Sequence, residues 1–422
     1  MLKQILLKFK DKYKESELLC GCMILAILFL GNCFSEYFSY ISFSVLAILV
    51  IISNMENGFS YLVFTIPFAG VGQQISGLFY GGIIIAYLVK QYIKMLIIDK
   101  KKIDKKLLIA LLIFVIYLCL PFGKYVMYFW IKTGVLLGVI LVFYLISRYP
   151  KEFRIKFNVN VLALSMLLSC GYFLTYFVSD YLQSVIIFSY SDEILRFQAL
   201  LLNPNVLAMP CTICLSILTY FILSKRFSWV EGMSFVIFLI LGLSTFSKNF
   251  LALAMIMFFI IVVYLLIKFP FKGVCFLTGI SILVILLVAF KQDLLLHYVG
   301  RFINIEEFAE MNREEILDKF TTHRYGLWVT YLEYLFEYPF VLLFGAGMGA
   351  KRLVGDSVHN IYIALLYHLG IVGVLLLGVV VFHMVKCFKK EYPLMINKMI
   401  FAPILIVGLM TMFEDLFMFM YV

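Results

Sequence analysis

Residues 250–267 read FLALAMIMFFIIVVYLLI, and they lie between Lys248 and Lys268 with no charged residue inside the stretch. A helix needs about 20 mostly apolar residues to cross the hydrocarbon core of a bilayer. Similar stretches recur along the 422 residues, of which 64% are hydrophobic and 14% charged, whereas about a quarter are charged in soluble proteins. The sequence therefore predicts an all-α polytopic membrane protein and excludes a separate soluble catalytic domain.

The apolar stretches predict about twelve or thirteen spans. The predicted spans are 18–34, 38–52, 59–71, 75–89, 107–122, 125–146, 157–178, 199–223, 229–246, 250–267, 273–290 and 360–385, with a last one beginning near Met399. The pair 59–71 and 75–89 is short enough to tilt or re-enter, and whether the last stretch completes a crossing stays open. The predicted organisation is thus a cytoplasmic amphipathic segment (1–17), spans 1–11 (18–290), a long extracytoplasmic loop with amphipathic helices (291–358) and C-terminal spans (359–422).

The basic residues predict the orientation, because cytoplasmic connections collect Lys and Arg. With the N-terminus inside, most of the 35 cations fall on the cytoplasmic side. The net charge of +10 is then an orientation signal, and we expect no nucleic-acid partner. All nine cysteines lie in or beside apolar stretches, which excludes a disulfide framework.

The loop 291–358 is the long polar stretch of the chain, so chemistry is expected there. Five of the eight arginines fall on the outer side in this topology, compared with six of the 27 lysines. A guanidinium group binds phosphate oxygens in pairs, which an ammonium cannot do. Arg196 either faces a lipid headgroup or is an interfacial anchor. Lys248, at a tight outer turn, either contacts an anionic ligand or snorkels to the surface.

His359 is the best single candidate for chemistry. We expect Asp356 or Ser357 to cap the helix that follows and to place the imidazole in its first turn, where the helix dipole favours a neutral ring. A neutral imidazole can accept a proton from a hydroxyl group; the alternative is a structural histidine. Earlier in the loop, Thr322 is a potential cap for a helix over 324–337 that places Arg324 and Trp328 one turn apart. No histidine pair has the spacing of a metal site.

Three segments resemble the O-antigen polymerase and ligase family, which includes the Wzy-type polysaccharide polymerases. They are Arg196-Phe-Gln-Ala-Leu-Leu-Leu-Asn-Pro-Asn-Val-Leu-Ala208, Ser244-Thr-Phe-Ser-Lys248 and the long loop. In the loop, Arg324, Trp328, the glycine run Gly345-x-Gly347-x-Gly349 and His359-Asn-Ile-Tyr362 ahead of Gly370-Ile-Val-Gly373 follow the order found in the family. The resemblance covers about the second half of the chain, and Lys248 departs from the arginine that many members carry.

The resemblance implies a GT-C-like, metal-independent glycosyltransferase of a bacterial plasma membrane that needs no cofactor. It would join undecaprenyl-diphosphate-linked oligosaccharides into capsular, exopolysaccharide or O-antigen polymer. In the implied mechanism His359 is the base, and Arg196 and Arg324 bind the diphosphate with help from Lys248. The residues that would shape the site are Asn205, Trp328 and Tyr362.

The implied partners are the lipid-linked donor and acceptor, the lipid bilayer, a chain-length regulator and a flippase. Three alternatives stay open. One is ligase-like transfer of the glycan to another acceptor, one is a transporter of lipid-linked glycan, and one is a structural or signalling scaffold. A transporter is expected to line a mid-membrane path with polar groups, whereas the predicted spans are nearly uncharged.

Overall fold

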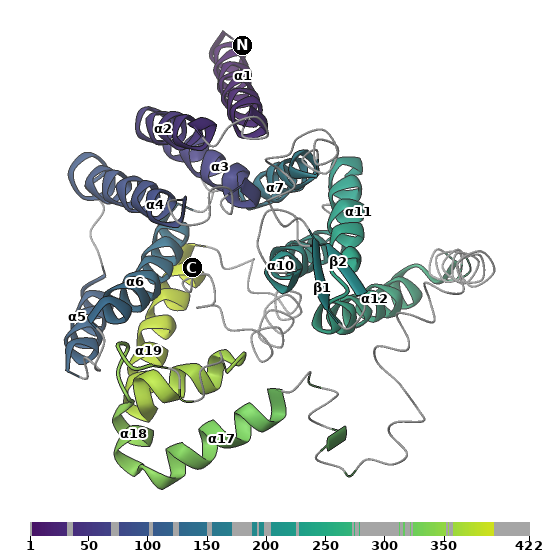
Figure 1. Ribbon diagram of the computed structural model, residues 1–422. Coiled ribbons are helices and arrows are strands. Elements are labelled where there is room, and N and C mark those ends of the chain that lie inside the picture. The colour runs from purple at the N-terminus through teal and green to yellow at the C-terminus, as the bar shows by residue number, and fades with distance from the viewer. Residues whose placement is uncertain are drawn as a thin grey trace.

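The computed structural model is helical over most of the chain that it describes, and the helices are arranged around a central region (Figure 1). It describes residues 2–31, 37–68, 76–100, 104–120, 126–149, 154–170, 188–191, 194–197, 204–224, 228–271, 274, 278, 312, 315–316, 321, 324–351, 353 and 358–391. This is consistent with the predicted all-α membrane protein. The exception among these residues is a short antiparallel hairpin, β1 (Phe188–Ser191) and β2 (Ile194–Phe197), which was not predicted.

The helices follow the apolar stretches of the sequence. They are α1 (Leu2–Gly31), α2 (Tyr37–Ile52), α3 (Met55–Thr65) with the 3-10 turn η1 (Ile66–Phe68), α4 (Ser76–Ile93) with the π-helical turn η2 (Lys94–Ile98), α5 (Lys105–Cys119), α6 (Val126–Arg148), α7 (Ile155–Ser169), α10 (Pro204–Leu223), α11 (Trp229–Ser244), α12 (Lys248–Lys268), α17 (Arg324–Glu337), α18 (Pro339–Phe344) and α19 (Ile361–Glu391). One helix, α1, covers both the predicted N-terminal segment and the first predicted span. The predicted spans 273–290 and from Met399 onward lie almost entirely outside the described residues.

Four helical segments in the described part of the chain are long and apolar enough to cross a membrane: Phe79–Ile98, Pro204–Leu223, Lys248–Lys268 and Ile361–Lys386. Five shorter apolar helices accompany them: Ser16–Gly31, Tyr37–Ile52, Lys132–Ile146, Ile155–Ser169 and Trp229–Ser244. The chain is therefore a membrane protein by the length and composition of its helices. The total number of spans and their orientation stay predictions.

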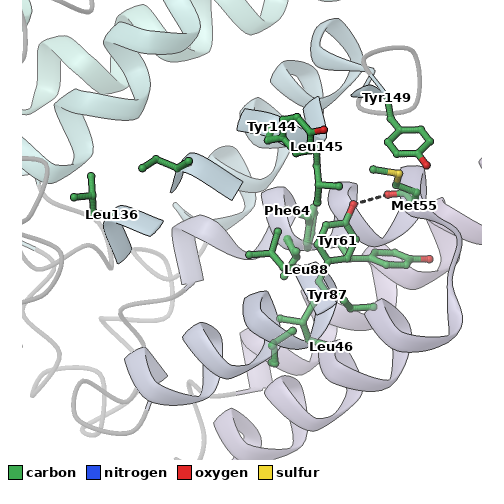
Figure 2. Close-up of a cluster of buried hydrophobic side chains, with 14 of the residues drawn as sticks. Leu46, Met55, Tyr61, Phe64, Tyr87, Leu88, Leu136, Tyr144, Leu145 and Tyr149 are labelled. Atoms are coloured by element: carbon green, nitrogen blue, oxygen red, sulfur yellow. Dashed lines mark hydrogen bonds between the residues drawn. The ribbon is translucent and has the colours of Figure 1, made fainter. Parts of the chain in front are cut away.

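The first large core joins α2, α3, α4 and α6, and its buried side chains meet in Figure 2. Tyr61 and Tyr144 are among the largest fully buried residues, and the hydroxyl of Tyr87 donates to the carbonyl oxygen of Met55 at 2.9 Å (Figure 2). That bond satisfies a tyrosine hydroxyl in an apolar interior, where an unbonded one would be costly. It also ties α4 to the first turn of α3.

The second core joins α7 to α10, α11 and α12. The helices α11 and α12 are separated by a tight turn: α11 ends at Ser244, and α12 begins at Lys248, with Ser247 as the N-cap residue. The hairpin lies beside this group in Figure 1, and Phe197 of β2 packs against both cores.

The C-terminal group consists of α17, α18 and α19, together with α5 and α6 (Figure 1). The long helix α19 is broken at Gly370, which has φ 66° and ψ 177°. The sequence predicted a single span here, 360–385. The structure has instead a short first segment, Ile361 to Leu369, that joins the rest of the helix at an angle. This break positions the candidate site.

Candidate functional site

Trp328 links the first loop helix to the segment that carries His359. It lies one turn after Arg324 in α17, as predicted, and its indole Nε1–H donates to the carbonyl oxygen of Val358 at 2.9 Å. Arg324 is 9% exposed, so this cation is largely enclosed by protein. The bond to Val358 brings the helix that carries Arg324 next to the backbone that enters His359. The cap of α17 involves Thr321, whose Oγ1 accepts from Tyr325 N–H at 2.9 Å; Thr322 lies outside the described residues.

His359 lies before the helix and not in its first turn, which corrects the predicted position. The cap is Asn360, because its Oδ1 accepts from the backbone N–H groups of Tyr362 and Ile363 at 3.0 and 3.2 Å. His359 itself has φ 48°, a left-handed conformation that few residues other than glycine adopt. It is half-buried, and its Nδ1 atom is buried. The chain therefore turns sharply at His359, immediately before a helix that is long and apolar enough to cross a membrane.

The predicted glycine run forms a turn that packs against the break in α19. Gly345 has φ 81°, and a Cβ atom there would lie 2.4 Å from the carbonyl oxygen of His368. Conversely, a Cβ atom on Gly370 would lie 2.4 Å from the backbone nitrogen of Gly345. Two further backbone bonds join the turn to the helix, from Ala346 N to Tyr367 O at 2.7 Å and from Gly347 N to His368 O at 3.1 Å. Both glycines are required by this close backbone contact.

A buried lysine lies beneath this turn. Lys132 of α6 is 2% exposed, and its Nζ lies 3.2 Å from the carbonyl oxygen of Ala350 and 3.1 Å from Nε2 of His368. The other ring nitrogen of His368, Nδ1, lies 3.0 Å from the carbonyl oxygen of Gly347. A carbonyl only accepts, so Nδ1 carries the hydrogen and Nε2 accepts from the ammonium group. The lysine and histidine side chains thus join α6, the glycine turn and α19.

The contribution of Lys132 was missed, because this residue was counted only as one of the six lysines expected on the outer side. A signal was present: Lys132 lies inside the predicted span 125–146, and a charged residue within a span points to a functional or pairing role. His368 lies two residues before the break in α19, at Gly370, and is 7% exposed.

The other predicted residues belong to the second group of helices. Arg196 lies on β2, opposite Ser189 of β1, and β2 contacts α11. Lys248 is the first residue of α12 and is half-buried. Asn205 follows Pro204, the first residue of α10, a position that suits proline. The bond from Trp328 to Val358 therefore joins the helix of Arg324 and Trp328 to the segment of His359 and Tyr362. Arg196, Lys248 and Asn205 lie on elements of another group.

Among the described residues, no three His, Cys, Asp or Glu side chains gather closely enough to hold a metal ion. Comparison with known proteins adds no identification: no family model, no curated protein and no solved structure matches the chain. The resemblance seen in the loop therefore stays a prediction.

Proposed function

We propose that this chain is a glycosyltransferase that polymerises undecaprenyl-diphosphate-linked oligosaccharides at the outer face of a bacterial plasma membrane. The observation that carries the proposal is the 2.9 Å bond from Trp328 to the carbonyl of Val358. This bond joins a helix with an enclosed arginine to the segment that carries His359, just before a helix long enough to cross a membrane. A cation and a histidine at the membrane boundary would suit a lipid diphosphate, whose anionic head lies there next to the reacting sugar.

The proposed step is an inverting displacement at the anomeric carbon of the donor. The acceptor hydroxyl oxygen forms the new bond to that carbon, and His359 takes the hydroxyl proton. The bond between the anomeric carbon and the diphosphate oxygen breaks, and the lipid diphosphate leaves with the electron pair. Arg324 is the cation in the group of His359 that stabilises its negative charge. Arg196 and Lys248 belong to the second group of helices, and in this proposal they contribute only when the bound diphosphate extends between the two groups. Asn205, Trp328 and Tyr362 shape the sugar site.

His359→Ala tests the proposed base in a strain that needs this chain for its surface glycan. We expect polymer synthesis to fall by at least about tenfold, as for the loss of an acid-base group, while the amount of protein in the membrane is unchanged. His383→Ala is the matched control, because His383 lies near the other end of the same helix. Polymer of full length and normal amount from His359→Ala would exclude His359 as the base.

Arg324→Lys and Arg196→Lys separate charge from the geometry of the guanidinium fork. Each keeps the positive charge but removes the paired donors, so we expect weaker donor binding with the protein still folded. Arg154→Lys is the control, since Arg154 forms a 4.0 Å ion pair with Glu56 in another part of the molecule. Unchanged donor affinity in both test variants would exclude the diphosphate clamp.

A transporter of lipid-linked glycan is the second candidate, and one observation favours it. The predicted spans looked almost uncharged, but Lys132 and His368 form a buried polar pair between α6 and α19. Polar groups inside a bundle are typical of transport paths. A transporter would move the lipid-linked unit without forming a glycosidic bond, so purified protein with donor and acceptor in liposomes distinguishes the two: new polymer supports the enzyme.

A further inference from the structure

The loop helix α17 carries three stripes of different character. Successive residues turn by about 100° around a helix, so residues three and four apart share a face. One stripe packs against the rest of the protein and consists of Arg324, Trp328, Tyr331 and Leu335. Roughly opposite lies a stripe of small and acidic residues, of which Gly326, Thr330, Glu333 and Glu337 are all exposed. A soluble helix would need only these two faces.

The third stripe lies between the other two, is apolar, and is covered by protein only in part. It consists of Tyr325, Val329, Leu332 and Phe336; the first two are half-buried, and the last two are 36% and 72% exposed. The exposed apolar surface continues past the end of α17 into α18. There Phe340 is 80% exposed and Phe344 is 46% exposed, and their rings stack at 6.4 Å.

We infer that α17 and α18 lie in the outer boundary of the bilayer, with Leu332, Phe336 and Phe340 inserted among the lipid acyl chains. Helices of this kind place their apolar face below the headgroups and keep the polar face in water. The three stripes of α17 meet these requirements together. One stripe packs on protein, the acidic stripe would face water, and the apolar stripe would face the lipid acyl chains.

The neighbouring helices indicate that a lipid leaflet covers this exposed apolar surface. The helix α18 packs directly on α19, which is long and apolar enough to cross a membrane. The inner segment of α19 also exposes apolar side chains at helical spacing, with Leu375, Val379 and Phe382 each at least 46% exposed. Exposed apolar side chains thus occur on α17, on α18 and on the helix against which α18 packs, and a lipid leaflet would cover all three. Aromatic side chains such as Tyr325 and Tyr338 suit this boundary, because they have an apolar ring and a polar end.

Tryptophan reporters in the full-length protein in nanodiscs test the inference. The chain has three tryptophans, Trp130, Trp229 and Trp328. Trp130→Phe and Trp229→Phe lower the background, and Trp328 is kept as a constant signal. Phe336→Trp or Phe340→Trp then places a reporter on the apolar stripe, and Glu333→Trp places a control reporter on the acidic stripe of the same helix. Each variant is measured with phosphatidylcholine brominated in the upper part of its acyl chains and, separately, with aqueous iodide.

We expect the brominated lipid to quench the reporters at positions 336 and 340 at least about twofold more than the control at 333, since only the apolar face enters the acyl region. Iodide should show the opposite order. Two results would overturn the inference. If iodide quenches all three positions alike, the helices stand in water. If neither quencher reaches positions 336 and 340, protein covers this surface, and a second copy of the chain becomes the occupant.

Discussion

Replacing Lys132 by Met tests whether the buried ammonium holds the glycine turn on α19. Met has a similar length but no donor, so the carbonyl of Ala350 and Nε2 of His368 would both lose the lysine. Each buried acceptor that loses its donor costs about 1–3 kcal/mol. Part of this cost is offset because the variant no longer buries an ammonium group. We therefore expect a net local destabilisation of about 2 kcal/mol.

Native-state hydrogen exchange measures this effect where it should occur. The backbone amides of Ala346 and Gly347 donate to α19, so they exchange only when the turn leaves the helix. A loss of about 2 kcal/mol corresponds to exchange that is about 30-fold faster. Lys105→Met is the control, because Lys105 is an exposed lysine at the start of α5. If these two amides exchange at the same rate in Lys132→Met as in the wild type, Lys132 does not hold the turn on α19.

Two further substitutions test the neighbouring contacts. Gly370→Ala should destabilise the protein by more than about 2 kcal/mol, because the new Cβ would lie 2.4 Å from the nitrogen of Gly345 and the residue has φ 66°. In Gly378→Ala the new Cβ meets no atom within 4 Å, so equal melting temperatures for the two variants in detergent would contradict this reasoning. Trp328→Phe removes the hydrogen-bond donor to the carbonyl of Val358, which should lower the local stability by about 1 kcal/mol. We therefore expect hydrogen exchange of the backbone amides next to Val358 to be about fivefold faster. An unchanged rate would show that the bond adds no stability.

The sequence predicts the helices of the membrane domain well where a long apolar run ends at charged or capping residues. The predicted span 250–267 is α12, which extends from Lys248 to Lys268. The predicted tight turn before it lies between Ser244 and Ser247. In lipid, a helix satisfies all the backbone hydrogen-bonding groups of such an uncharged run within the run itself. Local sequence is therefore sufficient at this position.

The candidate site is harder to predict, because its geometry depends on contacts between distant segments. Asp356, Ser357 and Asn360 are all residue types that cap helices. In the structure Asn360 is the cap, which places His359 outside the helix. The local sequence does not favour Asn360 over Asp356 or Ser357 as the cap. The break at Gly370 is also tertiary in origin, because it depends on Gly345, which approaches from the loop. Glycine in a span is otherwise compatible with an unbroken helix.

The contacts around the break in α19 also bear on the choice between an enzyme and a transporter. Leu369 ends the short first segment of α19, and its carbonyl lies 2.6 Å from the hydroxyl of Tyr117. The same hydroxyl lies 2.8 Å from the carbonyl of Phe344. Together with Lys132, this tyrosine fixes the first segment of α19 to α5 and α6. A transporter that opened beside α19 would have to break these buried bonds in every cycle. An enzyme needs them to persist, since acid-base groups act only when they are held in place. If Lys132→Met loosens the turn and lowers polymer synthesis, the rigid support is required, as expected for an enzyme; faster movement of lipid-linked glycan would instead support transport.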